Sequence, residues 1–403
     1  MKMAQLIRVF SSSSIGVIML TLLTGCGGGG SSPAPSSQPS GPSATLSTTY
    51  AYVTDQTNED IAQYRVNADG TLTTLGPKLP TGASSQPIAI AVDPAHKYAY
   101  VVLHAKDRID QYAINPDGTL STTPLPSVST GSKPFAIALT PSGRYAYVTN
   151  MASNSISQYS VDSATGALTS LPFPTIPTGT VPKGLTIDRS EKFVYVASAG
   201  DLKVYHYAID PTGQLLPPTS TASGGTASRV TLDPSNQFLY VSNNNVTISH
   251  PTPTTTVFSD AASSIAQFTT NISTTATLTP QTPPSIPSAG ALGLAIHPSK
   301  PVLYATNSVI LSTVSQFTIG SGGTLSAMSP STVPSGSNDN PPLHIVIDPT
   351  GTHAFVLHPF IGSTSGPTGL ISRYTIDAAT GALSFNGTVP SGLDPSAMAF
   401  AVK

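Results

Sequence analysis

Residues 134–150 read PFAIALTPSGRYAYVTN, and this stretch decides the fold. A short apolar run leads into a Thr-Pro-Ser-Gly turn, after which Tyr145–Asn150 alternates aromatic and small residues. Alternating runs on both sides of such a turn predict two antiparallel strands. Downstream, Ile156–Tyr159 is a third alternating run, and the turn at Thr165-Gly166 leads into a fourth. The stretch therefore belongs to a predicted unit of four β-strands.

The same unit recurs along the chain. The Tyr-rich run begins at Tyr50, Tyr98, Tyr145, Phe193, Phe238, Val302 and His353. Its spacing is 45 to 51 residues, with one interval of 64. Four strands in a unit of this length are typical of a propeller blade. Because helical periodicity is absent, we expect an all-β fold, a seven-bladed β-propeller with four antiparallel strands per blade over residues 45–403.

The two ends of the propeller complement each other. The first unit has no opening strand before Tyr50, whereas Leu393–Val402 at the C-terminus is an opening strand without a unit of its own. We expect the C-terminal strand to pair into the first blade and close the ring, which leaves no open sheet edge.

The N-terminus resembles that of a bacterial lipoprotein. Lys2 and Arg8 precede a short apolar run, Ile15–Leu23, which is too short to span a bilayer. The run ends in Leu-Thr-Gly-Cys26, similar to a lipobox, and Cys26 is the single cysteine of the chain. We expect residues 1–25 to be a lipoprotein signal peptide, Cys26 to be lipidated, and the Gly/Ser/Pro-rich residues 26–44 to be a flexible linker. A plain secretory signal peptide is the alternative.

Composition excludes several classes of function. Only 9% of the residues are charged and the formal net charge is −2, so the chain lacks the basic surface that nucleic acid binding requires. The Asp residues at turns and the repeated Gln residues are expected to be structural, because they recur from blade to blade. No cofactor motif and no metal-ligand spacing is present.

The Tyr-strand motifs resemble a known superfamily. Tyr147-Val148-Thr149-Asn150 is a YVTN motif, and Tyr240–Asn243 and Tyr304–Asn307 are variants of it. The chain is similar to the lactonase/YVTN seven-bladed β-propeller superfamily, which includes 6-phosphogluconolactonase-like proteins. The resemblance implies the propeller fold and a lactonase activity. Pro342-Leu343-His344 keeps the Pro and His of the Pro-Arg-His-like strands found at the channel mouth in such lactonases, but Leu343 replaces the Arg.

Two residues depart from the pattern of the opening strands. The third position of each motif is occupied by Ala89, Ala136, Gly184, Arg229, Gly293, His344 and Ala397. Five of these residues are small, so Arg229 and His344 need another explanation than packing. The longest loops, 243–264 and 357–370, follow in the same two blades and are expected on the face where the opening strands begin. Together with Lys183, Arg229 and His344 are the candidate catalytic or ligand-binding residues at the channel mouth.

Three functions are compatible with these residues. The first is a lipid-anchored extracytoplasmic propeller that binds a small molecule, a carbohydrate or an envelope protein at its channel mouth. The second is a lactone-ring hydrolase, in which Arg229 and Lys183 hold an anionic group and His344 acts as general base. The third is a spacer without a site. We expect a monomer in the bacterial cell envelope, at the outer membrane or in the periplasm, held to the membrane by its N-terminal lipid.

Overall fold

The computed structural model describes residues 47–252, 255–260, 263–271, 277–308, 312–337, 340–360 and 368–403. The signal peptide, Cys26 and the linker predicted from the sequence lie outside these residues. Residues Ser47–Lys403 form one compact unit. None of the described residues belongs to a helix long and apolar enough to cross a membrane.

Seven antiparallel sheets form the propeller, which confirms the predicted fold class. Blade 1 contains β31 (Pro395–Val402), β1 (Thr49–Asp55), β2 (Asp60–Val66), β3 (Leu72–Thr74) and β4 (Leu79–Pro80). Blade 2 contains β5 (Pro87–Val92), β6 (Tyr98–Leu103), β7 (Arg108–Ala113) and β8 (Leu125–Ser129). Blade 3 contains β9 (Pro134–Leu139), β10 (Tyr145–Asn150), β11 (Ser155–Val161) and β12 (Leu168–Pro177). Blade 4 contains β13 (Pro182–Ile187), β14 (Phe193–Ser198), β15 (Lys203–Ala208) and β16 (Thr219–Ala222).

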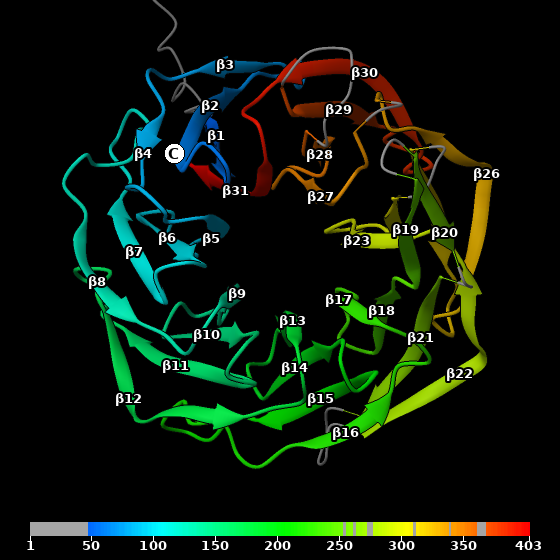
Figure 1. Cartoon of the computed structure of the whole chain (residues 1–403), viewed down its shortest axis with the longest axis horizontal. Helices are drawn as coiled ribbons and strands as arrows, with labels where there is room; N and C mark the ends of the chain where they lie inside the picture. Colours follow the sequence, from blue (N-terminus) through cyan, green and yellow to red (C-terminus); the bar gives the residue numbers. More distant parts are fainter. Residues whose placement is uncertain are drawn as a thin grey trace, which may run out of the picture. The chain divides into compact units, whose positions relative to one another are not determined.

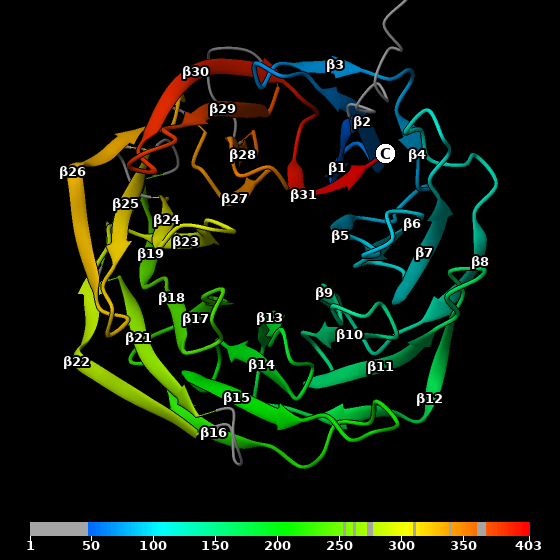
Figure 2. The same ribbon diagram turned by 180° about the vertical axis from the view of Figure 1, so that it is seen from behind.

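The remaining blades have the same order. Blade 5 contains β17 (Ala227–Leu232), β18 (Phe238–Asn243), β21 (Ser264–Asn271) and β22 (Thr277–Pro287). Blade 6 contains β23 (Ala291–Ile296), β24 (Val302–Asn307), β25 (Thr313–Ile319) and β26 (Leu325–Pro334). Blade 7 contains β27 (His344–Ile347), β28 (His353–His358), β29 (Leu370–Ile376) and β30 (Leu383–Pro390). Figures 1 and 2 show the sheets around a central axis, with the first strand of each blade innermost.

The C-terminal strand closes the ring as predicted. β31 pairs antiparallel with β1, and Tyr52 lies opposite Ala399 in the register. The fourth strand of blade 1 is divided into the short strands β3 and β4, both of which pair with β2. The long insertion of blade 5 contains a hairpin of its own, β19 (Val246–Thr252) paired with β20 (Thr255–Asp260). The sequence did not indicate this hairpin.

The second strand of each blade supplies the core. Tyr52, Tyr100 and Tyr147 are fully buried, and each packs toward the next blade. Their hydroxyls donate to the carbonyls of Gly118, Gly166 and Gly213 at 2.7 to 2.8 Å. Aromatic rings thus fill the space between blades while their hydroxyls are satisfied.

The repeated glutamines also join neighbouring blades, which explains their recurrence. In blade 3, Gln158 is buried; its Nε2 donates to Phe173 O at 2.9 Å, and its Oε1 accepts from Leu215 N of blade 4 at 2.7 Å. The other glutamine side chains that accept from a leucine N–H of the next blade are Gln63, Gln111, Gln267 and Gln316. His206 and Arg373 occupy this register position in blades 4 and 7. The prediction that these glutamines are structural is confirmed.

The turns between the first and second strands lie on one face of the propeller, the turn face. In blade 5, Asp233 accepts from Ser235 N, Gln237 N and Phe238 N at 2.7 to 2.9 Å. Asp93, Asp188 and Asp348 bond in the same way to the backbone N–H groups of their own turns. The carboxylate therefore accepts hydrogen bonds from backbone N–H groups that would have no acceptor in a tight turn, as the sequence predicted.

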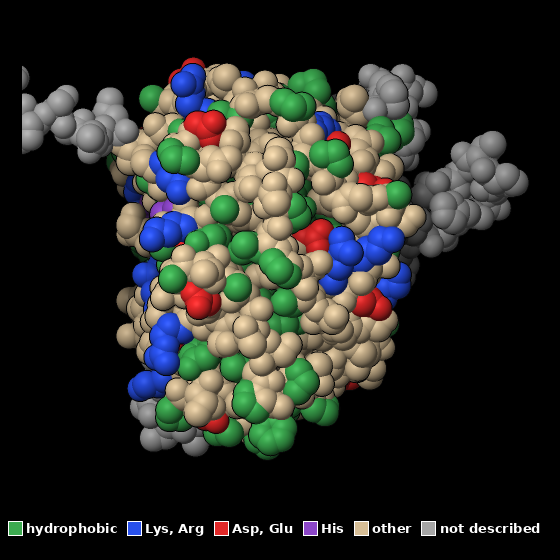
Figure 3. All heavy atoms as spheres, turned by 90° about the vertical axis from the view of Figure 1, so that its left-hand side faces the viewer, with side chains coloured by type: hydrophobic (Ala, Val, Ile, Leu, Met, Phe, Trp, Pro, Cys, Tyr) green, Lys and Arg blue, Asp and Glu red, His purple; other side chains and the backbone are tan. Residues whose placement is uncertain are grey.

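Charged side chains are sparse on the surface. Figure 3 shows one side of the propeller, on which uncharged side chains and backbone dominate between scattered charges. This agrees with the low share of charged residues, 9% of the chain.

Candidate functional site

The inner strands carry the two candidate residues identified by comparing blades. Arg229 is the third residue of β17 and lies opposite Ser242, whose hydroxyl accepts from Arg229 N at 3.0 Å. His344 begins β27 and lies opposite Leu357. The backbone N–H of Ala136 in β9 donates the same type of bond to Thr149 Oγ1, at 3.2 Å. The blade framework is therefore unchanged at Arg229, and only the side chain differs.

The side chain of Arg229 lies across the inner face of blade 4 and reaches blade 3. A Cβ atom added to Gly184 of β13 would meet Arg229 Cα and Ser228 O at 3.0 Å and Arg229 Cδ at 3.3 Å. The guanidinium carbon lies 5.0 Å from the ring centroid of Phe135 on β9, a cation–π distance. Gly184 leaves the space through which Arg229 passes, and Phe135 holds its charged end.

His344 has the same relation to blade 6. A Cβ atom on Gly293 of β23 would lie 2.8 Å from Leu343 O and 3.1 Å from His344 Cα. His344 also lines a cavity of about 360 Å³, whose apolar walls include Leu294, Val346 and Phe400. In both blades with a large third residue, the preceding blade therefore has glycine at that position.

Arg229 influences the other two candidate residues electrostatically. Burial lowers the pKa of Arg229 to about 10. Burial and the nearby Arg229 charge lower the pKa of His344 to about 3. Burial, and secondarily Arg229, also lower the pKa of Lys183. At neutral pH Arg229 is a cation and His344 is a neutral imidazole. Arg229 is thus close enough to influence both His344 and Lys183, and we call these three residues the inner cluster.

The inner cluster has no counter-charge within the part of the chain that the structure describes. No carboxylate is among the groups that shift the pKa of Lys183, Arg229 or His344. Arg229 Nη1 and His344 Nδ1 are buried and have no hydrogen-bond partner among the described residues. An unpaired guanidinium nitrogen at a buried position costs free energy, so the arrangement favours an incoming anion.

Both glutamates of the chain serve other purposes. Glu59 accepts from Ser84 N at 2.8 Å and Ser85 N at 3.0 Å. Glu191 accepts from Ser142 Oγ at 2.8 Å on the turn face. Neither glutamate is a carboxylate base for the inner cluster, as the sequence indicated for Glu191.

The remaining histidines of blade 7 are structural. His353 lies 3.3 Å from Asp348 of its own turn. His358 is fully buried, with Nδ1 2.9 Å from Asn340 O and Nε2 2.9 Å from Ser372 Oγ. Within the described ranges no three His, Cys, Asp or Glu side chains are grouped so that they could hold a metal ion.

The sequence did not identify Phe135 or the role of the two glycines. A signal for the glycines was present, since Gly184 and Gly293 immediately precede Arg229 and His344 in the series of third positions. Phe135 gave no signal, because its contact with Arg229 crosses a whole blade.

Comparison with known proteins gives a consistent family. The sequence profile of the lactonase family, described as a seven-bladed β-propeller, matches residues 30–231. No curated protein matches the sequence. A Bacteroides fragilis protein provisionally named 6-phosphogluconolactonase has a similar structure, with a TM-score of 0.68 and 19% identity, covering 90% of this chain and 100% of that chain.

Two further solved structures are similar. A Bacteroides uniformis protein with the same provisional name has a TM-score of 0.68 and 17% identity, covering 88% of this chain and 99% of that chain. The periplasmic gluconolactonase of Pseudomonas aeruginosa has a TM-score of 0.65 and 17% identity, covering 88% and 99%. At these identities the likeness establishes the fold alone.

Proposed function

Since the chain belongs to the seven-bladed β-propeller lactonase family, we propose that its inner cluster binds the anionic group of a small sugar-acid-like molecule. The observation that carries this proposal is the unpaired Nη1 of Arg229. A carboxylate or phosphate oxygen would supply the missing partner in a charge-assisted hydrogen bond, which is the stronger kind. Lys183, whose pKa the Arg229 charge helps to lower, adds a second basic side chain near Arg229.

The remaining side chains suit the rest of such a ligand. His344 is neutral at pH 7, so it offers a hydrogen-bond acceptor or donor to a hydroxyl without adding charge. The cavity beside it has apolar walls that accommodate a carbon skeleton. A ligand with an anionic end and several hydroxyls matches this combination.

Hydrolysis of a lactone ring is the second candidate function. The names of the similar structures, two provisional 6-phosphogluconolactonases and a gluconolactonase, favour it by analogy. Water would attack the lactone carbonyl while His344 accepts a proton from the water, and the ring C–O bond would break as the ring oxygen takes up a proton. The product is the open hydroxy acid, which releases one proton at neutral pH. A bound anion would offset the Arg229 charge and raise the pKa of His344, making it a stronger base.

Membrane anchoring through Cys26 is part of the proposal. The lipobox-like Leu23–Cys26 and the Gly/Ser/Pro-rich linker support a lipid-anchored propeller outside the cytoplasm. Incorporation of labelled palmitate that disappears in Cys26→Ala would support the anchor. If the unaltered protein and the Cys26→Ala variant are both unlabelled and both released to the medium, the plain secretory signal peptide is supported instead.

Calorimetric titration with gluconate, 6-phosphogluconate and glucose tests the binding function. We expect both anions to bind and glucose to bind at least tenfold more weakly. Arg229→Gln should weaken the binding of both anions by at least tenfold. Arg189→Gln, which changes an exposed arginine on the turn face, should leave their binding unchanged. Equal affinity for glucose and gluconate would refute the anion site.

Proton release at constant pH tests the second candidate. The substrates are glucono-δ-lactone and its 6-phosphate, with spontaneous hydrolysis subtracted. Turnover above background that is lost in both His344→Ala and Arg229→Gln would establish a lactonase. Binding without turnover would leave a binding protein.

A further inference from the structure

The junction between blades 5 and 6 differs from its neighbours on the turn face. At junction 3/4, Glu191 accepts from Ser142 Oγ at 2.8 Å. At junction 4/5, Asn236 Oδ1 accepts from Arg189 N at 3.0 Å. Lys300 stands at the same turn position in blade 6, but its Nζ donates to Asp377 O of blade 7 at 3.4 Å. The structure shows no hydrogen bond between the described turns of blades 5 and 6.

Two substitutions within the blade 6 turn explain the difference. His297 replaces the turn Asp, and its Nδ1 accepts only from Ser299 N at 3.1 Å and Lys300 N at 3.0 Å. Pro301 removes one backbone N–H that an Asp would bind, and Val302 N donates to Lys300 O at 2.8 Å. Glu191 and Asn236 have left-handed backbones, with φ of 57° and 58°, whereas Lys300 does not. Without that conformation, the Lys300 side chain does not turn back toward blade 5.

The aromatic residue at this junction also makes no hydrogen bond that would join the turns of blades 5 and 6. In blades 2 and 3, Tyr98 and Tyr145 donate their hydroxyls to Ala164 O at 2.9 Å and Pro211 O at 3.5 Å in the next blade. Blades 4 and 5 have Phe193 and Phe238 at this position. Phe238 packs on Gly323 but offers no hydroxyl. Ser321 takes the turn position of Pro211 in blade 6.

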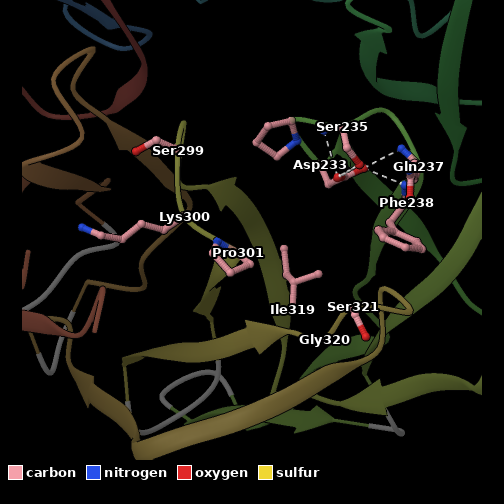
Figure 4. A pocket seen from close by; sticks show the side chains of 11 residues that line it. Asp233, Ser235, Gln237, Phe238, Ser299, Lys300, Pro301, Ile319, Gly320 and Ser321 are labelled. Carbon is pink, nitrogen blue, oxygen red and sulfur yellow. Dashed lines mark hydrogen bonds between the residues drawn. The ribbon is translucent and has the colours of Figure 1, made fainter. Parts of the chain in front are cut away.

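These changes coincide with a pocket of about 540 Å³, the junction pocket. Its walls include the apolar side chains Pro234, Phe238, Pro301 and Ile319, and polar atoms come from Ser235, Gln237, Ser299 and Ser321. Figure 4 shows these side chains around the gap, with Lys300 extending away from Asp233. The volume is in the range of pockets that hold small molecules.

The two charged residues that line the junction pocket, Asp233 and Lys300, have hydrogen-bond partners elsewhere. The Asp233 carboxylate is occupied by Ser235, Gln237 and Phe238 of its own turn. The Lys300 amine is directed to the carbonyl of Asp377 outside the pocket lining. The lining therefore combines apolar surface with neutral hydroxyl and amide groups, and an ionic ligand would lose its hydration without gaining a partner.

We propose that the junction pocket is a binding site for a neutral, mainly apolar ring compound with one or two hydroxyl or carbonyl groups. The ring would pack on Phe238, Pro301 and Ile319, and its polar groups would bond at the rim. This site is separate from the inner cluster, because Arg229 lies near the start of β17 whereas Asp233 follows its end. It takes a ligand of different charge and does not depend on the proposed function.

Binding of 2-naphthol, measured by calorimetry and by saturation-transfer NMR with the purified protein, tests the proposal. This probe is neutral at pH 7 and has an apolar double ring with one hydroxyl. The matched probe 2-naphthoate has the same rings and a negative charge. We expect 2-naphthol to bind with sub-millimolar affinity and 2-naphthoate to bind at least tenfold more weakly in the Arg229→Gln background, in which the inner cluster has lost its guanidinium.

Two variants close the pocket in different ways. Phe238→Tyr supplies the hydroxyl that Tyr98 and Tyr145 carry in blades 2 and 3, and Phe193→Tyr makes the same change in blade 4, one junction away. The triple change His297→Asp, Lys300→Asn and Pro301→Gln gives blade 6 the turn sequence of blade 5. We expect Phe238→Tyr and the triple change each to weaken the binding of 2-naphthol at least tenfold. Phe193→Tyr should leave this binding unchanged.

Three outcomes would overturn the proposal. The first is that 2-naphthol does not bind to the unaltered protein. The second is that 2-naphthoate binds as tightly as 2-naphthol. The third is that a folded Phe238→Tyr variant binds 2-naphthol as tightly as the unaltered protein does. Circular dichroism establishes folding, and if the triple variant fails to fold, Phe238→Tyr decides alone. Loss of gluconate binding in Arg229→Gln with retention of 2-naphthol would show that the two sites are independent.

Discussion

Replacing Gly184 by alanine tests whether the path of Arg229 across blade 4 positions its charge. The added Cβ would meet two backbone atoms, Arg229 Cα and Ser228 O, at 3.0 Å, as well as Arg229 Cδ at 3.3 Å. Backbone atoms on a paired inner strand cannot move without disturbing the ladder, so β13 and β17 must separate slightly. Overpacking of this kind costs about 1–3 kcal/mol of unfolding free energy. The displaced guanidinium would also lose its contact with Phe135.

The assay pairs unfolding with ligand affinity. Urea unfolding followed by circular dichroism gives the change in free energy, and calorimetric titration with gluconate gives the change in affinity. We expect a loss of about 1–3 kcal/mol and an affinity at least fivefold lower. The control is Gly322→Ala, because a Cβ there has no atom within 4 Å. Equal stability and equal gluconate affinity in the two variants would show that the space at Gly184 does not determine the position of Arg229.

Three further predictions follow from the packing between blades and from the charges. Gln158→Glu places a carboxylate oxygen against Phe173 O, so the pKa of the introduced carboxyl rises above its unfolded value of about 4.3. Stability is retained below about pH 4 and falls by about 2–4 kcal/mol as pH rises through the raised pKa, as urea titrations at pH 4 and 8 would show; a pH-independent loss would contradict this. Arg229→Gln should raise the pKa of His344 above about 3, because the guanidinium, in addition to burial, lowers it; NMR titration measures this pKa, and an unchanged value would be evidence against the electrostatic influence of Arg229 on His344. Deleting residues 395–403 removes the partner of β1 and should abolish cooperative folding; a native-like thermal transition would refute the closure role.

The repeat pattern made most of the fold predictable. Each blade is specified locally, by alternation in strands such as Tyr145–Asn150 and by turn residues such as Asp233, so seven copies gave seven independent signals. The missing first strand and the surplus Leu393–Val402 even predicted the closure. The β19–β20 hairpin had no counterpart in the other blades, so nothing in the repeat indicated it.

The candidate residues were found as exceptions to the repeat. Arg229 and His344 interrupt a series of small residues at one position of the opening strands. The interruption marks these two residues as unusual, but it does not show where their side chains lie. Their convergence, the low pKa of His344 and the unpaired Arg229 Nη1 depend on burial and on neighbours in other blades. The sequence did not indicate the junction pocket either, since the pocket needs Phe238 of blade 5 and Pro301 of blade 6 to face each other.

The sequence by itself determined the strands, the turns, the number of blades and the closure of the ring, because these depend on periodicity and on contacts between residues close in the chain or related by the repeat. Only the tertiary structure decided which side chains share a site. Gly184, Arg229 and Phe135 come from three blades, and their contact depends on how the sheets stand around the axis. Burial and the distance between charges set the protonation of His344, and both exist only once the ring has closed.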